Sequence, residues 1–260
     1  MLFRTHVIAR RELAPGFIRL TVHSADLGDM AWHGVDQRIK LFLPKRPNRL
    51  EGYLAGLPER GWKALWRSQD LEVRPYLRTF TIADGRPDVR EIDIDFFVDH
   101  AHGPASRFAQ SAAVGDELVF SGPLAALDHK RKGVQFAYNG QAQVLIAGDE
   151  TAFPAMLGIH RELPGSVSAL FLVQANSAEL AQWMRERLPG RQVRLLTDPQ
   201  QLYEAATHWA HTAAGTSAYA WFAAEHQVIG DLKRVFSARH RAVRLQAQGY
   251  WNRRGRAALS

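Results

Sequence analysis

Four consecutive residues in the first half of the chain carry side chains that together could hold a flavin. They are Arg78, Thr79, Phe80 and Thr81, within a stretch whose composition indicates a β-strand. Side chains alternate along a strand, so Arg78 and Phe80 share a face, and we expect Thr81 at the strand's end. A guanidinium can bind phosphate, a ring can stack on isoalloxazine, and a hydroxyl can hydrogen-bond near flavin N5. Taken alone, a tetrapeptide of this kind is also typical of many exposed strands.

A second segment could bind phosphate through backbone amides. A Gly-Pro turn precedes a predicted helix start, and the candidate residues are His100, Gly103, Pro104, Ala105 and Ser106. Free N–H groups at a helix start bind phosphate oxygens, and the Ser106 hydroxyl can add a further bond. An ordinary helix N-cap explains the same residues equally simply. His100 and His102 have no further ligands beside them, so we predict no metal site here.

A third set of candidates lies where predicted strands of the second half end. Asp149, Glu150 and Thr151 follow one strand and open a helix, which is where open α/β sheets place ligands. Carboxylates repel a diphosphate unless they contact hydroxyls or amides, and simple helix capping is the alternative. Further candidates near the ends of later strands are Glu225, Tyr250 and Trp251. Aromatic rings such as the last two could stack on a planar group or hold an anion beside the neighbouring arginines.

The predicted secondary structure that positions these candidates changes midway along the chain, from mostly strands to strands that alternate with helices. Short alternating strands are predicted at residues 17–23, 38–43, 79–82, 91–98 and 117–120. Their number and spacing favour a small antiparallel barrel, with a short helix inside residues 51–73. Later strands alternate with helices, at residues 143–147, 169–173, 192–196, 219–223 and 243–247. That alternation predicts a parallel α/β sheet, with the boundary between the two parts in residues 127–141.

Composition narrows the class of protein. The 260 residues are 46% hydrophobic and 23% charged, which is an ordinary globular balance for one large domain or two modest ones. The chain has no cysteine, which excludes disulfides, iron–sulfur clusters, thiolate zinc sites and a cysteine nucleophile. No run approaches the ~18 apolar residues of a membrane span, and no signal peptide is visible. We therefore expect a cytoplasmic protein without stable membrane association.

Basic residues are concentrated near the C-terminus. The formal net charge is +7, and residues 231–260 contain eight Lys or Arg against one acid. Such a concentration indicates an anionic partner, although a solvated charged face is the alternative. Three separated basic clusters supply one candidate substrate-binding residue each, namely Lys45, Lys130 and Arg253. No helix-turn-helix, zinc finger or RNP-like sequence is present, so we expect no nucleic-acid partner.

In this order, the motifs resemble those of the siderophore-interacting protein family, the FAD-dependent ferric-siderophore reductases of bacteria. The resemblance rests on Arg78–Thr81, Gly103–Ser106, Gly148–Ala155, Glu225 and Gly249–Trp251. It implies a two-domain β + α/β fold. A six-stranded antiparallel β-barrel over residues 1–127 would bind FAD, and a Rossmann-like parallel α/β sheet over residues 141–260 would bind NAD(P)H.

The resemblance also implies a reaction. NADPH or NADH would donate a hydride to the flavin beside Thr81, the catalytic candidate, and single electrons would then reduce Fe(III) in an anionic ferric siderophore. We expect a monomer. Three positions depart from the family pattern, because Phe80 replaces a tyrosine, Ala83 replaces a frequent arginine and Ala224 replaces a glycine. The alternatives are another flavin reductase of the ferredoxin-reductase type and a non-catalytic module that binds siderophores or other anions.

Overall fold

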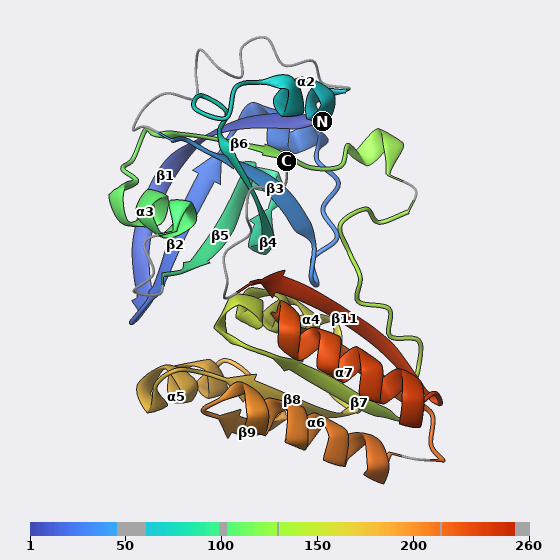
Figure 1. Cartoon of the computed structure of the whole chain (residues 1–260). Coiled ribbons are helices and arrows are strands. Elements are labelled where there is room, and N and C mark those ends of the chain that lie inside the picture. The colour runs from blue at the N-terminus through green and yellow to red at the C-terminus, as the bar shows by residue number, and fades with distance from the viewer. Residues whose placement is uncertain (46–60, 99–102, 129, 214, 253–260) are drawn as a thin grey trace. The chain divides into compact units, whose positions relative to one another are not determined.

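The structure is a computed structural model, and it describes residues 1–45, 61–98, 103–128, 130–213 and 215–252. The chain divides into two compact units, Met1–Val134 and Gln135–Ser260. Figure 1 draws both units with their helices and strands labelled. Each unit has its own hydrophobic core and is described by itself below.

The first unit is a closed barrel of antiparallel strands in the order β1-β2-β5-β4-β3-β6, which confirms the predicted six-stranded barrel. Its strands are β1 (Leu2–Ala14), β2 (Phe17–His23), β3 (Arg38–Leu43), β4 (Tyr76–Arg86), β5 (Glu91–Phe97) and β6 (Glu117–Ser121). Alternate residues of these strands point inward and fill the barrel with aliphatic and aromatic side chains. Closure leaves the barrel without an unpaired strand edge.

Short helices decorate the barrel. They are η1 (Ala25–Asp29), α2 (Trp62–Ser68), η2 (Pro87–Val89), α3 (Pro104–Ser111) and η3 (Ala125–Leu127). Helix α2 lies within the segment where a short helix is predicted. Helix α3 packs on the barrel core through buried Ala109 and partly buried Phe108. The sequence pattern had not marked β1, although Phe3, Thr5 and Val7 alternate inward there.

The second unit is a five-stranded sheet in the order β11-β10-β7-β8-β9, with every neighbouring pair parallel, as predicted. Its strands are β7 (Gln143–Gly148), β8 (Ser168–Gln174), β9 (Gln192–Leu196), β10 (Ala218–Glu225) and β11 (Val243–Trp251). The connecting helices are η4 (Glu150–Ala152), α4 (Phe153–Glu162), α5 (Ala178–Glu186), α6 (Pro199–Thr212) and α7 (His226–Arg239). The strand order reverses between β7 and β10, and open α/β sheets bind ligands at that switch point.

Helices cover both faces of this sheet (Figure 1). Helices α6 and α7 pack on one face, against inward side chains such as Leu172 and Phe222. On the other face, Phe153 of α4 meets Trp183 of α5 with ring centroids 5.4 Å apart, and His160 of α4 contacts Phe171 of β8. Successive residues of a strand point to opposite faces, so each strand supplies both layers. Among the described residues, no helix is both long and apolar enough to cross a membrane.

Candidate functional site

Strand β4 carries the four residues of the predicted flavin motif. Its register with β3 pairs Arg78 with Leu41 and Phe80 with Ile39, whose side chains both belong to the barrel core. Residues directly opposite in an antiparallel pair share a face, so Arg78 and Phe80 lie on one face, as predicted. The expectation that Thr81 ends the strand is wrong, because β4 continues to Arg86. Its pairing with β5 begins next, at Ile82, and includes an irregularity before Asp84.

Thr81 lies on the opposite face from Arg78 and Phe80, where it pairs with Arg38. It is only 6% exposed, and its hydroxyl oxygen is buried with no hydrogen-bond partner among the described residues. A buried hydroxyl without a partner is costly, typically by about 1–3 kcal/mol. Such an atom is a candidate for contact with a bound group. The backbone N–H of the next residue, Ile82, donates to the Gln37 carbonyl over 2.9 Å, which fixes the strand at this point.

A chain of aromatic contacts connects the flavin motif with the second predicted segment. Phe80 meets Phe96 of β5 at 4.6 Å between ring centroids, and Phe96 meets Phe108 of α3 at 6.3 Å. Helix α3 begins at an N-cap glycine, Gly103, followed by Pro104, and its first turn carries no acidic side chain. No acid of this turn therefore offsets the N-terminal end of the helix dipole, which favours an anion. The structure thus places the Gly103–Ser106 turn on the same barrel core as Phe80.

Tyr76 is a residue that the sequence reasoning missed. The Arg78 guanidinium carbon lies 5.5 Å from the centroid of the Tyr76 ring, and the Lys45 ammonium lies 5.3 Å from it. The Tyr76 ring therefore lies beside two predicted site residues. Arg78 is predicted to bind phosphate, and Lys45 is predicted to bind the substrate. Period-two alternation through residues 76, 78 and 80 was the signal that could have found it. Exposed Thr79, on the other face, accepts a hydrogen bond from Lys40 Nζ at 2.5 Å.

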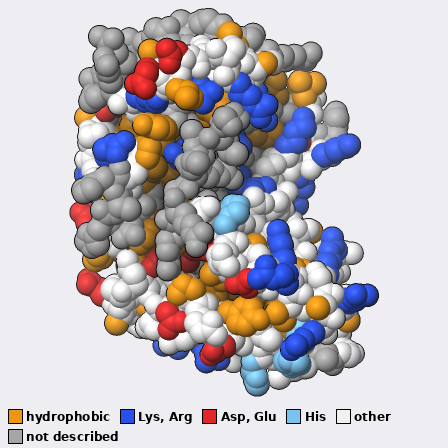
Figure 2. Space-filling model, viewed as in Figure 1, with side chains coloured by type: hydrophobic (Ala, Val, Ile, Leu, Met, Phe, Trp, Pro, Cys, Tyr) orange, Lys and Arg blue, Asp and Glu red, His pale blue; other side chains and the backbone are white. Residues whose placement is uncertain are grey.

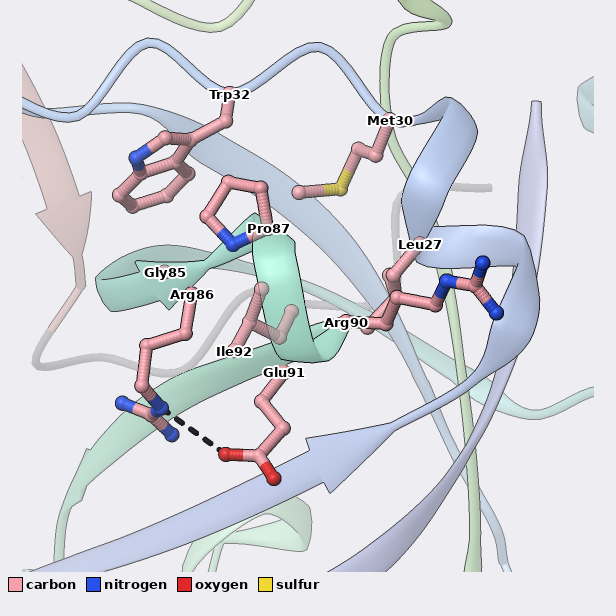
Figure 3. Close-up of a pocket in the computed structure, with 9 residues that line it drawn as sticks. All are labelled: Leu27, Met30, Trp32, Gly85, Arg86, Pro87, Arg90, Glu91 and Ile92. Carbon is pink, nitrogen blue, oxygen red and sulfur yellow. Dashed lines mark hydrogen bonds and ion pairs between the residues drawn. The ribbon is translucent and has the colours of Figure 1, made fainter.

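A small pocket elsewhere in the barrel contains none of the predicted site residues. Figure 3 shows the Trp32 ring beside Gly85 and Pro87, with the ion pair between Arg86 and Glu91 below. A Cβ on Gly85 would lie 2.8 Å from the Trp32 ring, so only glycine lets the ring pack there. The cavity is about 10 Å³, which is room for about one water molecule. It is far too small for a nucleotide cofactor.

In the second unit, the predicted residues gather at the carboxyl edge of the sheet. Asp149 is 1% exposed, and one of its oxygens accepts from the Thr151 amide at 3.0 Å and hydroxyl at 2.5 Å. Its other oxygen accepts from Trp251 Nε1 at 2.7 Å, which joins the ends of β7 and β11. Burial raises the pKa of Asp149, and these hydrogen bonds oppose that rise. The carboxylate is therefore engaged with hydroxyl, amide and indole donors.

The other two acids of this edge also bind backbone amides. Glu150 accepts from the Asn176 amide at 2.6 Å, which ties the turn after β7 to the end of β8. Glu225 caps α7 by accepting from the amides of Gln227 and Val228 at 2.6 and 3.4 Å. The capping alternative therefore describes Asp149, and Glu225, for which capping was not predicted, is a helix cap as well. Whether these residues also contact a nucleotide stays a prediction.

Of the remaining predicted residues, His100 and Arg253 lie outside the described residues. Exposed Lys130 belongs to a segment that is hydrogen-bonded to the barrel. There, buried Asp128 accepts from His33 Nε2 at 2.8 Å and from the Lys132 amide at 3.0 Å. These hydrogen bonds, with burial opposing them, lower the pKa of Asp128. Figure 2 shows lysine and arginine side chains on the visible face of each unit. The described residues include no group of three or more His, Asp or Glu able to hold a metal.

The barrel residues fit FAD. Arg78 offers an exposed guanidinium, Phe80 a partly buried ring and the start of α3 a set of amides for phosphate. Within the part of the chain that the structure describes, the buried hydroxyl of Thr81 lacks a hydrogen-bond partner, and a bound flavin could supply one. Each feature is modest alone. Arg78 and Phe80 lie on one face of β4, Thr81 lies on the other, and α3 packs on the same barrel core as Phe80.

Comparisons with known proteins show which family each unit matches. Residues 6–127 match the model of the siderophore-interacting FAD-binding domain, and residues 141–254 match that of the siderophore-interacting protein. The NADPH-dependent ferric-chelate reductase of Escherichia coli is 28% identical over 259 residues, covering 96% of this chain and 93% of that protein. Ferric vibriobactin reductase ViuB of Vibrio cholerae is 24% identical over 172 residues, covering 66% of this chain and 58% of ViuB.

Solved structures share the fold. Siderophore-interacting protein SipS of Aeromonas hydrophila superposes with a TM-score of 0.71 and 24% identity, covering 97% of this chain and 92% of SipS. A cytochrome P450 reductase of Amycolatopsis, GcoB, gives 0.63 with 12% identity, covering 95% of this chain and 70% of GcoB. Since the two family models account for both units in chain order, the protein belongs to the siderophore-interacting protein family, with an FAD-binding domain at its N-terminus.

Proposed function

We propose that this protein is an NAD(P)H-dependent flavoprotein that reduces Fe(III) in a ferric siderophore to Fe(II). The observation that carries the proposal is the match of both units, in order, to models of one family. A relative that spans nearly the same length is a ferric-chelate reductase that depends on NADPH. We propose NADPH or NADH as the electron donor and a monomer as the working form.

The chemistry of the substrate explains why reduction releases iron. Siderophore oxygens are hard ligands, which hold Fe(III) much more strongly than Fe(II). Reduction therefore loosens the metal without breaking the chelator. Iron is the substrate's own metal, so no protein side chain has to bind it permanently.

The proposed roles of the barrel residues follow from their chemistry. When bound, FAD would take a hydride from the nicotinamide and pass single electrons to the ferric chelate. Arg78 and the amides at the start of α3 would bind its phosphates, and Phe80 would stack on its ring. Thr81 would offer its hydroxyl to the N5 edge. Lys45, Lys130 and Arg253 would attract an anionic ferric chelate by their positive charge.

An anaerobic experiment tests the proposal directly. The purified protein should be yellow, and its flavin should bleach when NADPH or NADH is added without oxygen. Adding ferric chelates one at a time should then restore the oxidised spectrum and produce Fe(II). Re-oxidation by free flavin or a protein acceptor but by no ferric chelate would favour the other flavin reductases. A colourless protein that binds chelates without turnover would favour the non-catalytic module.

A further inference from the structure

The two neighbouring aromatic residues at the end of β11 have different surroundings. Tyr250 is half-buried and meets buried Trp221 of β10 with ring centroids 6.5 Å apart. Trp251 follows it and is 38% exposed, the largest exposed aromatic side chain among the described residues. The pairing of β11 with β10 is irregular here, because Gly249 pairs with Ala224 and Trp251 with Glu225, which leaves Tyr250 as an extra residue. Tyr250 packs against Trp221, and Trp251 remains at the surface.

Exposed Trp251 is nevertheless held at both its side chain and its backbone. Its indole Nε1 donates to the buried Asp149 carboxylate at 2.7 Å, and its carbonyl oxygen lies 3.2 Å from His226 Nδ1. The strand approaches His226 closely, because a Cβ on Gly249 would lie within 2.6 Å of that imidazole ring. An exposed side chain normally keeps its rotamer freedom, and losing it costs free energy. Here that cost is incurred in the folded protein, before any ligand arrives.

The place of this anchored ring is the edge where a dinucleotide is expected. Trp251 pairs with Glu225 at the end of β10, and β10 borders the point where strand order reverses. Ligands of open α/β sheets lie outside the carboxyl ends of the strands at that point. Since its N–H is already bonded, Trp251 can offer a ligand only its ring surface. An indole ring surface attracts planar and cationic groups, and the oxidised nicotinamide ring is both.

We propose that Trp251 stacks against the nicotinamide ring of the dinucleotide, and that Asp149 is a positioning residue that fixes the orientation of the indole. The inference rests on the proposed function, because it assumes that a nicotinamide dinucleotide is the electron donor. It also gives the buried acid a role compatible with a diphosphate nearby. Asp149 faces the indole and Thr151, whose donors satisfy its oxygens.

Comparing dinucleotides with fragments that lack nicotinamide isolates this contact. Dissociation constants would be measured calorimetrically for NAD⁺ against ADP-ribose, and for NADP⁺ against 2′-phospho-ADP-ribose. In Trp251→Ala, we expect about tenfold weaker binding of the dinucleotide that the wild type prefers, with unchanged binding of its fragment. In Trp251→Phe and Asp149→Asn, we expect the same selective loss but a smaller one, about threefold. The phenylalanine keeps a ring without the N–H, and the asparagine keeps the shape without the charge.

A matched control comes from the barrel. Trp66 Nε1 also donates one hydrogen bond, to the Pro75 carbonyl at 3.0 Å, so Trp66→Phe removes an indole N–H elsewhere. This variant should bind all four ligands like the wild type. Equal losses for dinucleotide and fragment in Trp251→Ala, or no loss for either, would overturn the inference and leave the reductase function standing. A wild type that binds neither dinucleotide nor fragment would overturn both.

Discussion

The buried hydroxyl of Thr81 has no hydrogen-bond partner among the described residues, so removing it should have two opposite effects. Without FAD, the hydroxyl lowers the stability of the barrel, so Thr81→Val should raise the free energy of unfolding of the apoprotein by about 1 kcal/mol. With FAD, the same change would remove the hydrogen bond that we propose between Thr81 and the flavin edge. Reduction by NAD(P)H should slow about tenfold, or ~1.4 kcal/mol of barrier. Chemical denaturation and stopped-flow absorbance measure the two effects.

A second buried threonine of the barrel provides the control for Thr81. The Thr5 hydroxyl donates to the Leu118 carbonyl at 2.6 Å. Thr5→Val should therefore destabilise the apoprotein by about 1 kcal/mol and leave flavin reduction unchanged. If Thr81→Val reduces the flavin at the wild-type rate, Thr81 does not contact the N5 edge.

Arg78 should control how much FAD the protein retains. Arg78→Ala removes a guanidinium proposed to bind phosphate, but Arg78 is exposed, so the barrel should keep its fold. We expect a lower ratio of flavin to protein absorbance after dilution and gel filtration. Arg4→Ala, which removes an arginine paired with Glu117 on the same barrel, should keep full occupancy. Full occupancy in Arg78→Ala as well would show that the phosphates are bound elsewhere.

At the scale of elements, local patterns gave most of the fold but not the contacts between distant elements. Strand alternation predicted that Arg78 and Phe80 share a face, because that depends only on neighbouring residues. The end of β4 was predicted too early, because its second half is held by pairing with β5 rather than by its own composition. The bond between Asp149 and Trp251 joins residues 102 positions apart, and no local pattern encodes it. The sequence therefore identified both residues as candidates but did not predict the hydrogen bond between their side chains.

Two histidines at helix ends should make the second unit sensitive to mild acid. Burial, reinforced by Arg191 and Arg161, lowers the pKa of His160, and burial with the charges of His211 and Arg239 lowers that of His240. A lowered histidine pKa means that the folded state binds fewer protons than the unfolded state. Stability is then complete above the ordinary pKa of about 6.5 and is lost as pH falls below it. The melting temperature of this unit should be lower at pH 5.5 than at pH 7.5.

Replacing both histidines tests that cause. His160→Gln combined with His240→Gln should reduce the difference in melting temperature between the two pH values. Asp149 has a raised pKa, so its contribution has the opposite sign and favours the folded state as pH falls. An unchanged pH difference in the double variant would assign the acid sensitivity to other groups.

At the scale of the whole molecule, the excess of positive charge should increase the rate at which an anionic substrate encounters the protein. Exposed charges are screened beyond about 8–10 Å at physiological ionic strength. Turnover of an anionic ferric chelate should therefore fall steeply as salt rises, while turnover of a neutral hydroxamate chelate should change little. Reversing the charge of Lys45, Lys130 and Arg253 together should raise KM for the anionic chelate and leave flavin reduction by NAD(P)H unchanged. Equal salt sensitivity for both chelates would leave the excess charge unexplained by substrate binding.

Along the chain, few residues separate the last hydrogen bonds to the barrel from the first hydrogen bond to the second unit. Asp128 and Gly133 are still bonded to the barrel, through His33 and through Arg38, whose backbone and side chain both donate to the Gly133 carbonyl at 3.2 Å. By Ala137, the amide already donates to the Tyr219 hydroxyl of the second unit at 3.0 Å. Any hinge motion between the units would have to be absorbed by the few torsion angles in between. Residues inserted there would lengthen the tether without breaking either set of bonds.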